Sequence, residues 1–304
     1  MSTKLTKGLT LGLIGFDGKK IRSINSTICW RKPAGVQDTK RTMARYKYAI
    51  GMVSAHNIYR KANTSSCKIW CHCFRDVDLY LPNRPTILMS ESDFVDPVGI
   101  KTLKPAKKWD FYYFTMGGLQ GNTYKGMELF VDCLPVLCGK LGLRGVLIKY
   151  AKPKRQFKLN RRRHRLWGKY KKYITVLKGK QNVAQITSKS KFGFFPNIQD
   201  CSPLLLTESL VRGCPILVNE DILGGWKYVN DETGAFFTKI NIEEKARFIL
   251  DAKFKTRKNY MKEYGYKNSA IRLADFCKEH IPILKRYSMI GFAGTNTIME
   301  KLCS

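Results

Sequence analysis

Two carboxylates bracket the stretch Asp200-Cys201-Ser202-Pro203-Leu204-Leu205-Leu206-Thr207-Glu208, with seven residues between them. Serine is a preferred N-cap residue and proline is favoured at the first helical position, so we expect a helix that is capped by Ser202 and begins at Pro203. Asp200 would then lie in the loop before the helix, and Glu208 about two turns along it. Because open α/β sheets bind ligands where loops leave the carboxyl ends of their strands, this stretch is a candidate ligand site.

A turn and a short apolar strand follow the predicted helix. Gly213 is a typical residue just past a helix end, and Pro215 prevents the helix from continuing. Apolar runs then alternate with helical patterns over most of the chain from residue 109 onward. The strands that we expect there are 110–115, 145–149, 173–177, 192–195, 215–218 and 234–237. This alternation favours an α/β fold, in which helices wrap a parallel sheet.

A second informative segment lies upstream. The aromatic strand candidate Trp109–Phe114 is followed by a glycine-rich loop that contains Gly117, Gly118 and the Lys125-Gly126 pair. The apolar helix candidate 127–141 then begins. Glycine-rich loops that lead into helices present backbone N–H groups to phosphates, so Lys125 and this loop form a candidate anion site.

Together the two segments resemble the carboxyl-terminal donor domain of nucleotide-sugar glycosyltransferases with the GT-B fold, of the group 1 or family 4-like kind. The Glu-x7-Glu motif of that family corresponds to Asp200-x7-Glu208 here, and its Gly-x-Pro turn corresponds to Gly213-Cys214-Pro215. The family pattern continues with Gly224-Gly225-Trp226 and with the turn Thr233-Gly234. The resemblance therefore covers an ordered series of elements and not a single motif.

The resemblance implies a role for each matching residue. Lys125, together with Gly117 and Gly118, would neutralise the diphosphate of the donor. Glu208 would accept hydrogen bonds from the ribose hydroxyls, and Asp200 would face the sugar hydroxyls as a catalytic residue. The remaining donor-binding residues of the motif are Ser202, Pro203, Leu204 and Thr207.

Two departures from the family pattern affect the implied donor site. Asp200 is one methylene shorter than the usual Glu, which bears on the sugar that fits and on the role itself. Thr115-Met116-Gly117 stand where the family commonly has an Arg, so one diphosphate contact is absent or is supplied elsewhere.

The activity implied by the resemblance is that of a hexosyl- or pentosyltransferase. Such an enzyme moves a sugar from a UDP- or GDP-sugar to a hydroxyl of a glycan, a glycoconjugate or a lipid-linked acceptor, with no metal and no cofactor besides the nucleotide-sugar substrate. Inverting transfer would need a base near the acceptor, for which His56 and Asp17 are the candidates. Retaining transfer needs no such base, and both stereochemical outcomes stay open.

The expected organisation is GT-B-like, with two Rossmann-like domains on parallel sheets, of which the N-terminal one is shortened. We assign residues 1–104 to the acceptor-side domain, 105–285 to the donor domain, and 286–304 to a terminal helix that packs back on the first domain. Within the first domain we expect strands at 9–16 and 86–90 and a helix at 42–61.

The net charge of +32 is unevenly placed along the chain. Residues 152–172 hold eleven Lys or Arg and no Asp or Glu. Interleaved Trp167, Tyr170 and Tyr173 are typical of a nucleic-acid patch with stacking rings. An anionic membrane surface, an acidic acceptor, the donor diphosphate or a solvated face fits the run as well, and we favour the membrane or the acceptor over nucleic acid. A basic nucleic-acid-binding protein and a non-catalytic GT-B-derived binding protein remain the alternative functions.

The ten cysteines indicate a reducing compartment, because most of them are scattered among apolar residues. The cluster Cys67–Cys73 alternates as a buried strand does and has no second Cys/His pair, so we expect no metal site. No stretch approaches the roughly 20 apolar residues of a transmembrane helix, and 9–16 fits a core strand better than a signal peptide. We therefore expect a cytoplasmic protein, peripheral at a membrane where one is involved and not secreted. Its compact, lysine-rich form suits a viral or microbial enzyme.

Overall fold

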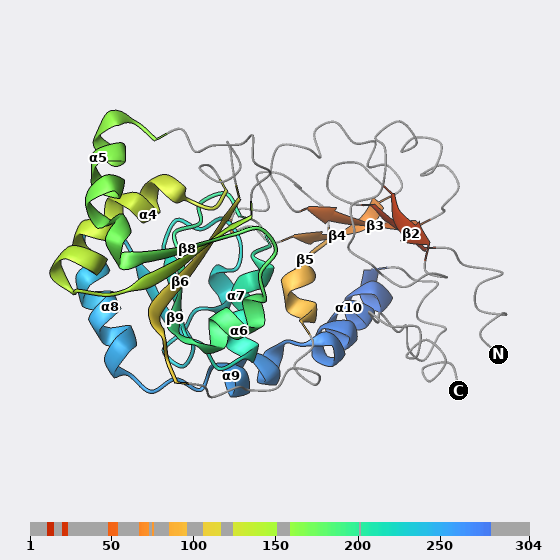
Figure 1. Ribbon diagram of the computed structural model, residues 1–304. Helices are drawn as coiled ribbons and strands as arrows, with labels where there is room; N and C mark the ends of the chain where they lie inside the picture. Colours follow the sequence, from red (N-terminus) through yellow and green to blue (C-terminus); the bar gives the residue numbers. More distant parts are fainter. Residues whose placement is uncertain are drawn as a thin grey trace. The chain divides into compact units, whose positions relative to one another are not determined.

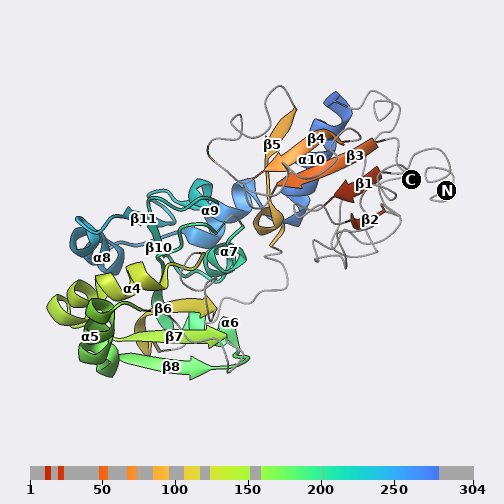
Figure 2. The same cartoon turned by 90° about the horizontal axis from the view of Figure 1, so that it is seen from above.

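The computed structural model describes residues 11–14, 20–23, 48–53, 67–72, 75, 85–95, 106–116, 124–150, 159–200 and 202–280 of the chain. The chain divides into two compact units. The first unit combines Met1–Val95 with Glu263–Ser304, and the second unit is Asp96–Lys262. Each unit has its own sheet (Figure 1 and Figure 2).

The second unit is built on a six-stranded parallel sheet. Its strands are β6 (Trp109–Met116), β7 (Gly145–Tyr150), β8 (Ile174–Lys178), β9 (Ser190–Phe195), β10 (Ile216–Asn219) and β11 (Gly234–Phe237). The strand order is β11-β10-β9-β6-β7-β8, and every neighbouring pair runs parallel. The α/β class and the six strands predicted from the sequence are confirmed. Counted along the chain, this is the doubly wound order 3-2-1-4-5-6.

Helices cover both faces of this sheet (Figure 1). One face carries α4 (Met127–Leu134) with its π-helical continuation η4 (Pro135–Lys140), α5 (Arg161–Tyr170) and α8 (Ile242–Asp251). The other face carries α6 (Val183–Ser188) and α7 (Leu204–Val211). The remaining helical segments of the unit are η5 (Lys171–Tyr173), η6 (Trp226–Tyr228) and α9 (Thr256–Glu263).

Aromatic side chains of the sheet and of α4 form the core on the face that α4 and α8 cover. Tyr113 of β6 stacks on Phe130 of α4 with ring centroids 4.4 Å apart, and Phe194 of β9 lies 4.9 Å from Phe237 of β11. All four rings are fully buried. Burial of such large apolar surfaces fixes the helices on the sheet and so fixes the loops at the strand ends.

Gly145 makes room for this aromatic core. In the β6–β7 register it lies opposite Phe111, and a Cβ at Gly145 would lie 2.3 Å from the Phe111 ring. Phe111 is fully buried and packs against other rings, so it cannot move aside cheaply. Packing therefore requires glycine at a strand position where its backbone freedom is otherwise unfavourable.

We expect Gly145→Ala to lower the free energy of unfolding by about 1–3 kcal/mol, because the added methyl overpacks the Phe111 ring. Gly168→Ala is the matched control, since Gly168 is exposed in α5 and a Cβ there has no atom within 4 Å. It should raise stability by about 0.5–1 kcal/mol through helix propensity. Urea unfolding followed by circular dichroism measures both, and equal effects would contradict the packing argument.

The first unit has a five-stranded sheet of mixed direction. Its strands are β1 (Leu11–Ile14), β2 (Lys20–Ser23), β3 (Tyr48–Val53), β4 (Cys67–His72) and β5 (Thr86–Leu88), in the order β2-β1-β3-β4-β5. Only the β1–β2 pair is antiparallel among the described pairs. The helix α10 (Tyr266–His280) packs against β4 and η3 (Glu91–Phe94).

A backbone carbonyl joins α10 to the first unit. The C=O of Asp93 accepts hydrogen bonds from the Gly265 N–H at 2.9 Å and from the Ser269 hydroxyl at 2.8 Å. The division at Glu263 therefore lies earlier than the boundary at residue 285 that we expected from the sequence. The expected terminal helix 286–304 lies outside the described residues.

The predicted helix at 42–61 is wrong. Its described part, Tyr48–Val53, is the strand β3, which pairs in parallel with β1 and β4. The stretch mixes an aromatic and β-branched residues with a glycine, which favours a strand in a sheet over a helix. The strands predicted at 9–16, 67–73 and 86–90 are confirmed as β1, β4 and β5.

Candidate functional site

The candidate site lies where the strand order of the second unit reverses. β6 and β9 are neighbours in the sheet, but the chain leaves β6 towards α4 and leaves β9 towards α7 on the opposite face (Figure 1). In open α/β sheets, ligands bind in the crevice between two such diverging loops. Lys125 follows β6 and Asp200 follows β9, so both predicted residues belong to this edge.

Lys125 and Asp200 form an ion pair, Nζ to Oδ2. The same carboxylate oxygen accepts a hydrogen bond from Asn197 Nδ2 at 2.6 Å. The side chains of Lys125 and Asp200 are only 19% and 12% exposed. Because water screens this pair poorly, it holds the two loops together more firmly than an exposed ion pair would.

The backbone around Lys125 is fixed from two sides. The Tyr113 hydroxyl donates to the Lys125 C=O at 2.8 Å. The next residue, Gly126, has φ +65°, and a Cβ there would lie 1.7 Å from the Pro196 carbonyl oxygen. Only glycine fits both the left-handed conformation and this contact, so the Lys125–Gly126 turn rests directly on the segment after β9.

The loop that carries Asp200 is tied to the loop after β10. Asn219 Nδ2 donates to the Asn197 C=O at 3.1 Å. The Gly224 N–H donates to the Asp200 C=O at 2.9 Å, and the Leu223 N–H donates to the Ile198 C=O at 2.8 Å. These bonds satisfy the polar backbone of an irregular segment, so Asp200 is held by three neighbouring strand ends.

A small hollow adjoins the ion pair and measures about 10 Å³. Its lining residues are Phe114, Lys125, Phe195, Asn197, Asp200, Pro203 and Leu205. That volume is about the smallest that holds one water molecule. Among the described residues, this hollow is therefore too small for a sugar or a nucleotide, and both members of the Lys125–Asp200 pair line it.

Helix α7 begins one residue later than predicted. Its first helical residue is Leu204, its N-cap is Pro203, and no side chain caps it. The prediction that Ser202 caps the helix is therefore wrong. The Leu204 N–H instead donates to the Ser202 C=O at 2.8 Å, and the Leu206 N–H donates to the Pro203 C=O at 2.9 Å. Backbone carbonyls thus accept the N–H bonds that the expected cap would have accepted.

Glu208 lies about one turn into α7, nearer to the helix start than we expected from the sequence, and pairs with Arg212. Arg212 Nη1 lies 3.4 Å from Glu208 Oε2 and donates to the Glu208 C=O at 2.8 Å. Burial raises the pKa of Glu208 above its ordinary value, and Arg212 opposes this rise. Glu208 does not line the small hollow, so of the two carboxylates in the motif only Asp200 contacts Lys125.

Several predicted site residues lie outside the described part of the chain, namely Gly117, Gly118, His56 and Asp17. Their roles stay predictions. Within the residues that the structure does describe, no three His, Cys, Asp or Glu side chains gather in an arrangement suited to a metal ion.

Three residues that support the site were not singled out from the sequence. Asn197 orients the Asp200 carboxylate, Asn219 holds Asn197, and Tyr113 holds the Lys125 backbone. The only sequence signal for the two asparagines is their place at the ends of apolar strands, where polar residues often serve ligand sites. Tyr113 looks like any other aromatic residue of a buried strand.

Comparison with known proteins supports the fold. No protein-family model matches the sequence, and no curated protein matches it. Solved structures do match: a variant of S. aureus TarM in complex with Fondaparinux, alpha-GlcNAc-glycerol and UDP has a TM-score of 0.57 at 11% identity, over 75% of this chain and 50% of that one. The chain thus spans about half the length of the TarM structures.

Two further structures match over larger shares. AviGT4, a glycosyltransferase involved in Avilamycin A biosynthesis, has a TM-score of 0.56 at 12% identity, over 77% of this chain and 68% of that one. The lipopolysaccharide outer core galactosyltransferase WaaB has a TM-score of 0.56 at 8% identity, over 83% of this chain and 72% of that one. The fold of this chain is therefore that of the GT-B glycosyltransferases.

We expect Gly126→Ala to cost clearly more stability than Gly142→Ala. Both glycines have left-handed φ, +65° and +66°, so both alanines lose about 1 kcal/mol from backbone strain. Only at Gly126 does the new Cβ meet the Pro196 carbonyl, whereas nothing lies within 4 Å at Gly142. The extra loss at Gly126 should be about 1–3 kcal/mol, measured by urea unfolding. Equal losses would mean that the Lys125 turn does not rest on Pro196.

Proposed function

We propose that this protein is a glycosyltransferase that moves a sugar from a UDP- or GDP-sugar to a hydroxyl of a glycan, a glycoconjugate or a lipid-linked acceptor, without a metal ion. The observation that carries the proposal is the Lys125–Asp200 pair at the point where the strand order reverses. The GT-B fold supports it, as does the UDP bound to the TarM variant, a structural neighbour.

Lys125 is suited to the leaving diphosphate. Departure of a nucleoside diphosphate leaves negative charge that some group must neutralise, and without a metal this falls to lysines and to N–H groups at helix starts. Lys125 stands two residues before the first residue of α4, so its ammonium and the helix N-terminus act on the same anion. A bound diphosphate would take the place of Asp200 as the partner of Lys125.

Asp200 is suited to the sugar. Once Lys125 turns to the diphosphate, the Asp200 carboxylate can accept hydrogen bonds from sugar hydroxyls, while Asn197 keeps it oriented. Separation of the pair on donor binding would thus widen the hollow. It would also free Lys125 to bind the diphosphate and Asp200 to bind the sugar. We assign Glu208 to the ribose, because one carboxylate can accept a hydrogen bond from each of the two ribose hydroxyls.

The direct test measures donor binding and donor cleavage. Calorimetry with UDP and with GDP should find one nucleotide that binds, and at 100 times its dissociation constant it should stabilise the protein by about 2.7 kcal/mol. The matching nucleotide sugars should then release free sugar slowly, also in the presence of EDTA. Binding without any release would indicate a non-catalytic binding protein, and no binding would refute the proposal.

We expect Asp200→Asn to bind the free nucleoside diphosphate about fivefold more tightly, because Lys125 loses its competing carboxylate and the repulsion of the phosphates falls by about 1 kcal/mol. Sugar release should fall at the same time. The control Glu232→Gln removes the same charge at an exposed position before β11. It should leave nucleotide affinity and sugar release unchanged. Weaker nucleotide binding by Asp200→Asn would argue against a diphosphate at Lys125.

Nucleotide affinity should also depend on the protonation of Glu208. Only the ionised carboxylate accepts both ribose hydroxyls, so affinity should fall as the pH drops through the pKa of Glu208. Because burial raises that pKa, the fall should begin above the ordinary range near about 4.3. Glu208→Gln should weaken binding by roughly tenfold or more and remove this pH dependence, whereas the exposed Glu244→Gln should not. A pH profile that Glu208→Gln leaves unaltered would contradict the assignment.

A further inference from the structure

The outer side of α5 presents only positive charge. Between Arg161 and Tyr173 the chain has seven Lys or Arg and no Asp or Glu. We call six of these residues, all of them exposed, the α5 basic face: Arg161, Arg162, Arg165, Lys169, Lys171 and Lys172. Arg161, Arg165 and Lys169 follow each other at i, i+4 spacing, so they form one stripe along the helix.

Carboxylates do not neutralise this face. Arg162 shares Asp132 with other cations at 2.9 Å, but within the described ranges none of the other five cations has a carboxylate within ion-pair distance. Repulsion among these five cations, three on α5 and two on η5, lowers the stability of the fold. The arrangement is therefore suited to an anionic partner that lies along the helix.

The rings interleaved with these cations face inward. Leu166, Trp167 and Tyr170 pack against the hydrophobic core, and the Trp167 ring lies 6.4 Å from Phe130. Because these rings are half-buried against the core, they offer only part of their surface for the stacking of nucleotide bases, on which binding of single strands relies together with charge. The α5 basic face thus supplies exposed charge with little exposed ring surface, which favours a membrane surface over nucleic acid.

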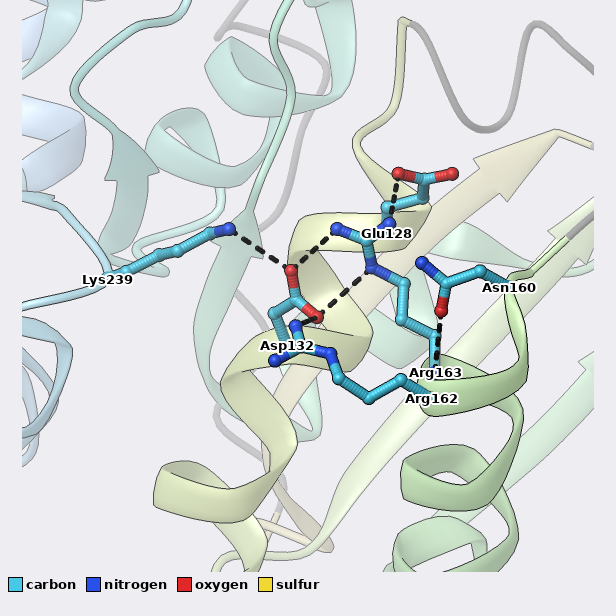
Figure 3. Close-up of polar contacts among 6 residues, drawn as sticks. All are labelled: Glu128, Asp132, Asn160, Arg162, Arg163 and Lys239. Atoms are coloured by element: carbon cyan, nitrogen blue, oxygen red, sulfur yellow. Dashed lines mark hydrogen bonds and ion pairs between the residues drawn. The ribbon is translucent and has the colours of Figure 1, made fainter.

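A network around Asp132 fixes a second element beside α5 (Figure 3). Asp132 of α4 has a side chain that is only 4% exposed. It accepts hydrogen bonds from Arg162 Nη2 at 2.9 Å, from Arg163 Nη2 at 2.8 Å and from Lys239 Nζ at 3.1 Å. Lys239 lies in the turn between β11 and α8. The shared carboxylate therefore holds this turn against the amino-terminal end of α5.

The residue after Lys239 is the most exposed large apolar residue in the described part of the chain. Ile240 is 96% exposed, and its N–H donates to the Thr238 hydroxyl at 3.2 Å, which fixes the turn. A single exposed apolar side chain is ordinary on a protein surface. In a turn that shares Asp132 with Arg162 of the α5 basic face, however, it can supply the apolar contact that peripheral membrane binding combines with charge.

We propose that the α5 basic face and Ile240 form a docking surface for a lipid bilayer that contains anionic lipids. The cations bind the headgroups, and Ile240 enters the interface between headgroups and acyl chains. None of the helices in the described part of the chain combines the length and the apolar composition needed to span a membrane, so the proposed attachment is peripheral. It does not depend on the proposed sugar transfer.

The test is co-sedimentation of the full chain with vesicles. The protein should sediment with vesicles of equal parts phosphatidylcholine and phosphatidylserine, not with phosphatidylcholine alone, and less at higher salt. Arg165→Gln with Lys169→Gln should weaken binding about 25-fold, at about fivefold for each cation. The control pair Lys253→Gln with Lys258→Gln removes two exposed cations from other elements and should have a much smaller effect. Equal losses in the two pairs would overturn the proposal.

Ile240→Ser separates a bilayer from a soluble polyanion. It should weaken binding to the anionic vesicles and leave retention on heparin, or binding to a single-stranded oligonucleotide, unchanged. Met261→Ser, which alters another exposed apolar residue, should change neither. Thermal unfolding of each variant checks that it is folded. If Ile240→Ser leaves vesicle binding intact while the oligonucleotide binds more tightly than the vesicles, the surface belongs to nucleic acid and the proposal fails.

Discussion

The parallel pairing of β6 with β9 is the constraint on which the second unit depends. It brings together two strands that are far apart in the sequence, with Tyr112 opposite Gly193. A side chain at Gly193 would collide with Tyr112, since a Cβ there would lie 2.9 Å from the Tyr112 hydroxyl oxygen. With this pairing in place, the carboxyl ends of the two strands meet, the loops beyond them diverge, and Lys125 can reach Asp200.

The parts of this arrangement that depend on local pattern could be predicted from the sequence. Alternating apolar and helical periods mark all six strands, and the spaced carboxylates mark Asp200 as part of a site. The contacts that hold the site could not be predicted in the same way. The Asn197 amide and the Tyr113 hydroxyl each hold the loop that follows their own strand, and Gly126 packs on Pro196 across the β6–β9 pair. The periodicity of one strand contains none of these contacts.

The wrong predictions have a common cause. The segment 42–61 has an apolar spacing that suits a helix, but pairing with two neighbouring strands made Tyr48–Val53 a strand. At the start of α7, a serine cap contributes only about 1 kcal/mol. Backbone bonds of the Ser202–Leu204 turn therefore displaced it without great loss. In both cases the local sequence preferences for the two alternatives differ by too little free energy to decide the outcome, so tertiary contacts decide it.

Charge serves two separate purposes in this basic chain. Lys125 is mostly buried, and an ammonium buried without a counter-charge would be costly, so Asp200 stabilises it. Under the proposed function, a ligand would have to bring enough negative charge in the right geometry to replace that carboxylate, and this would select against weakly charged anions. At the exposed α5 basic face, an anion need not displace a carboxylate from most of the cations. Their charge attracts anions over about a Debye length. Selection and attraction are thus assigned to different residues, and a change in one need not disturb the other.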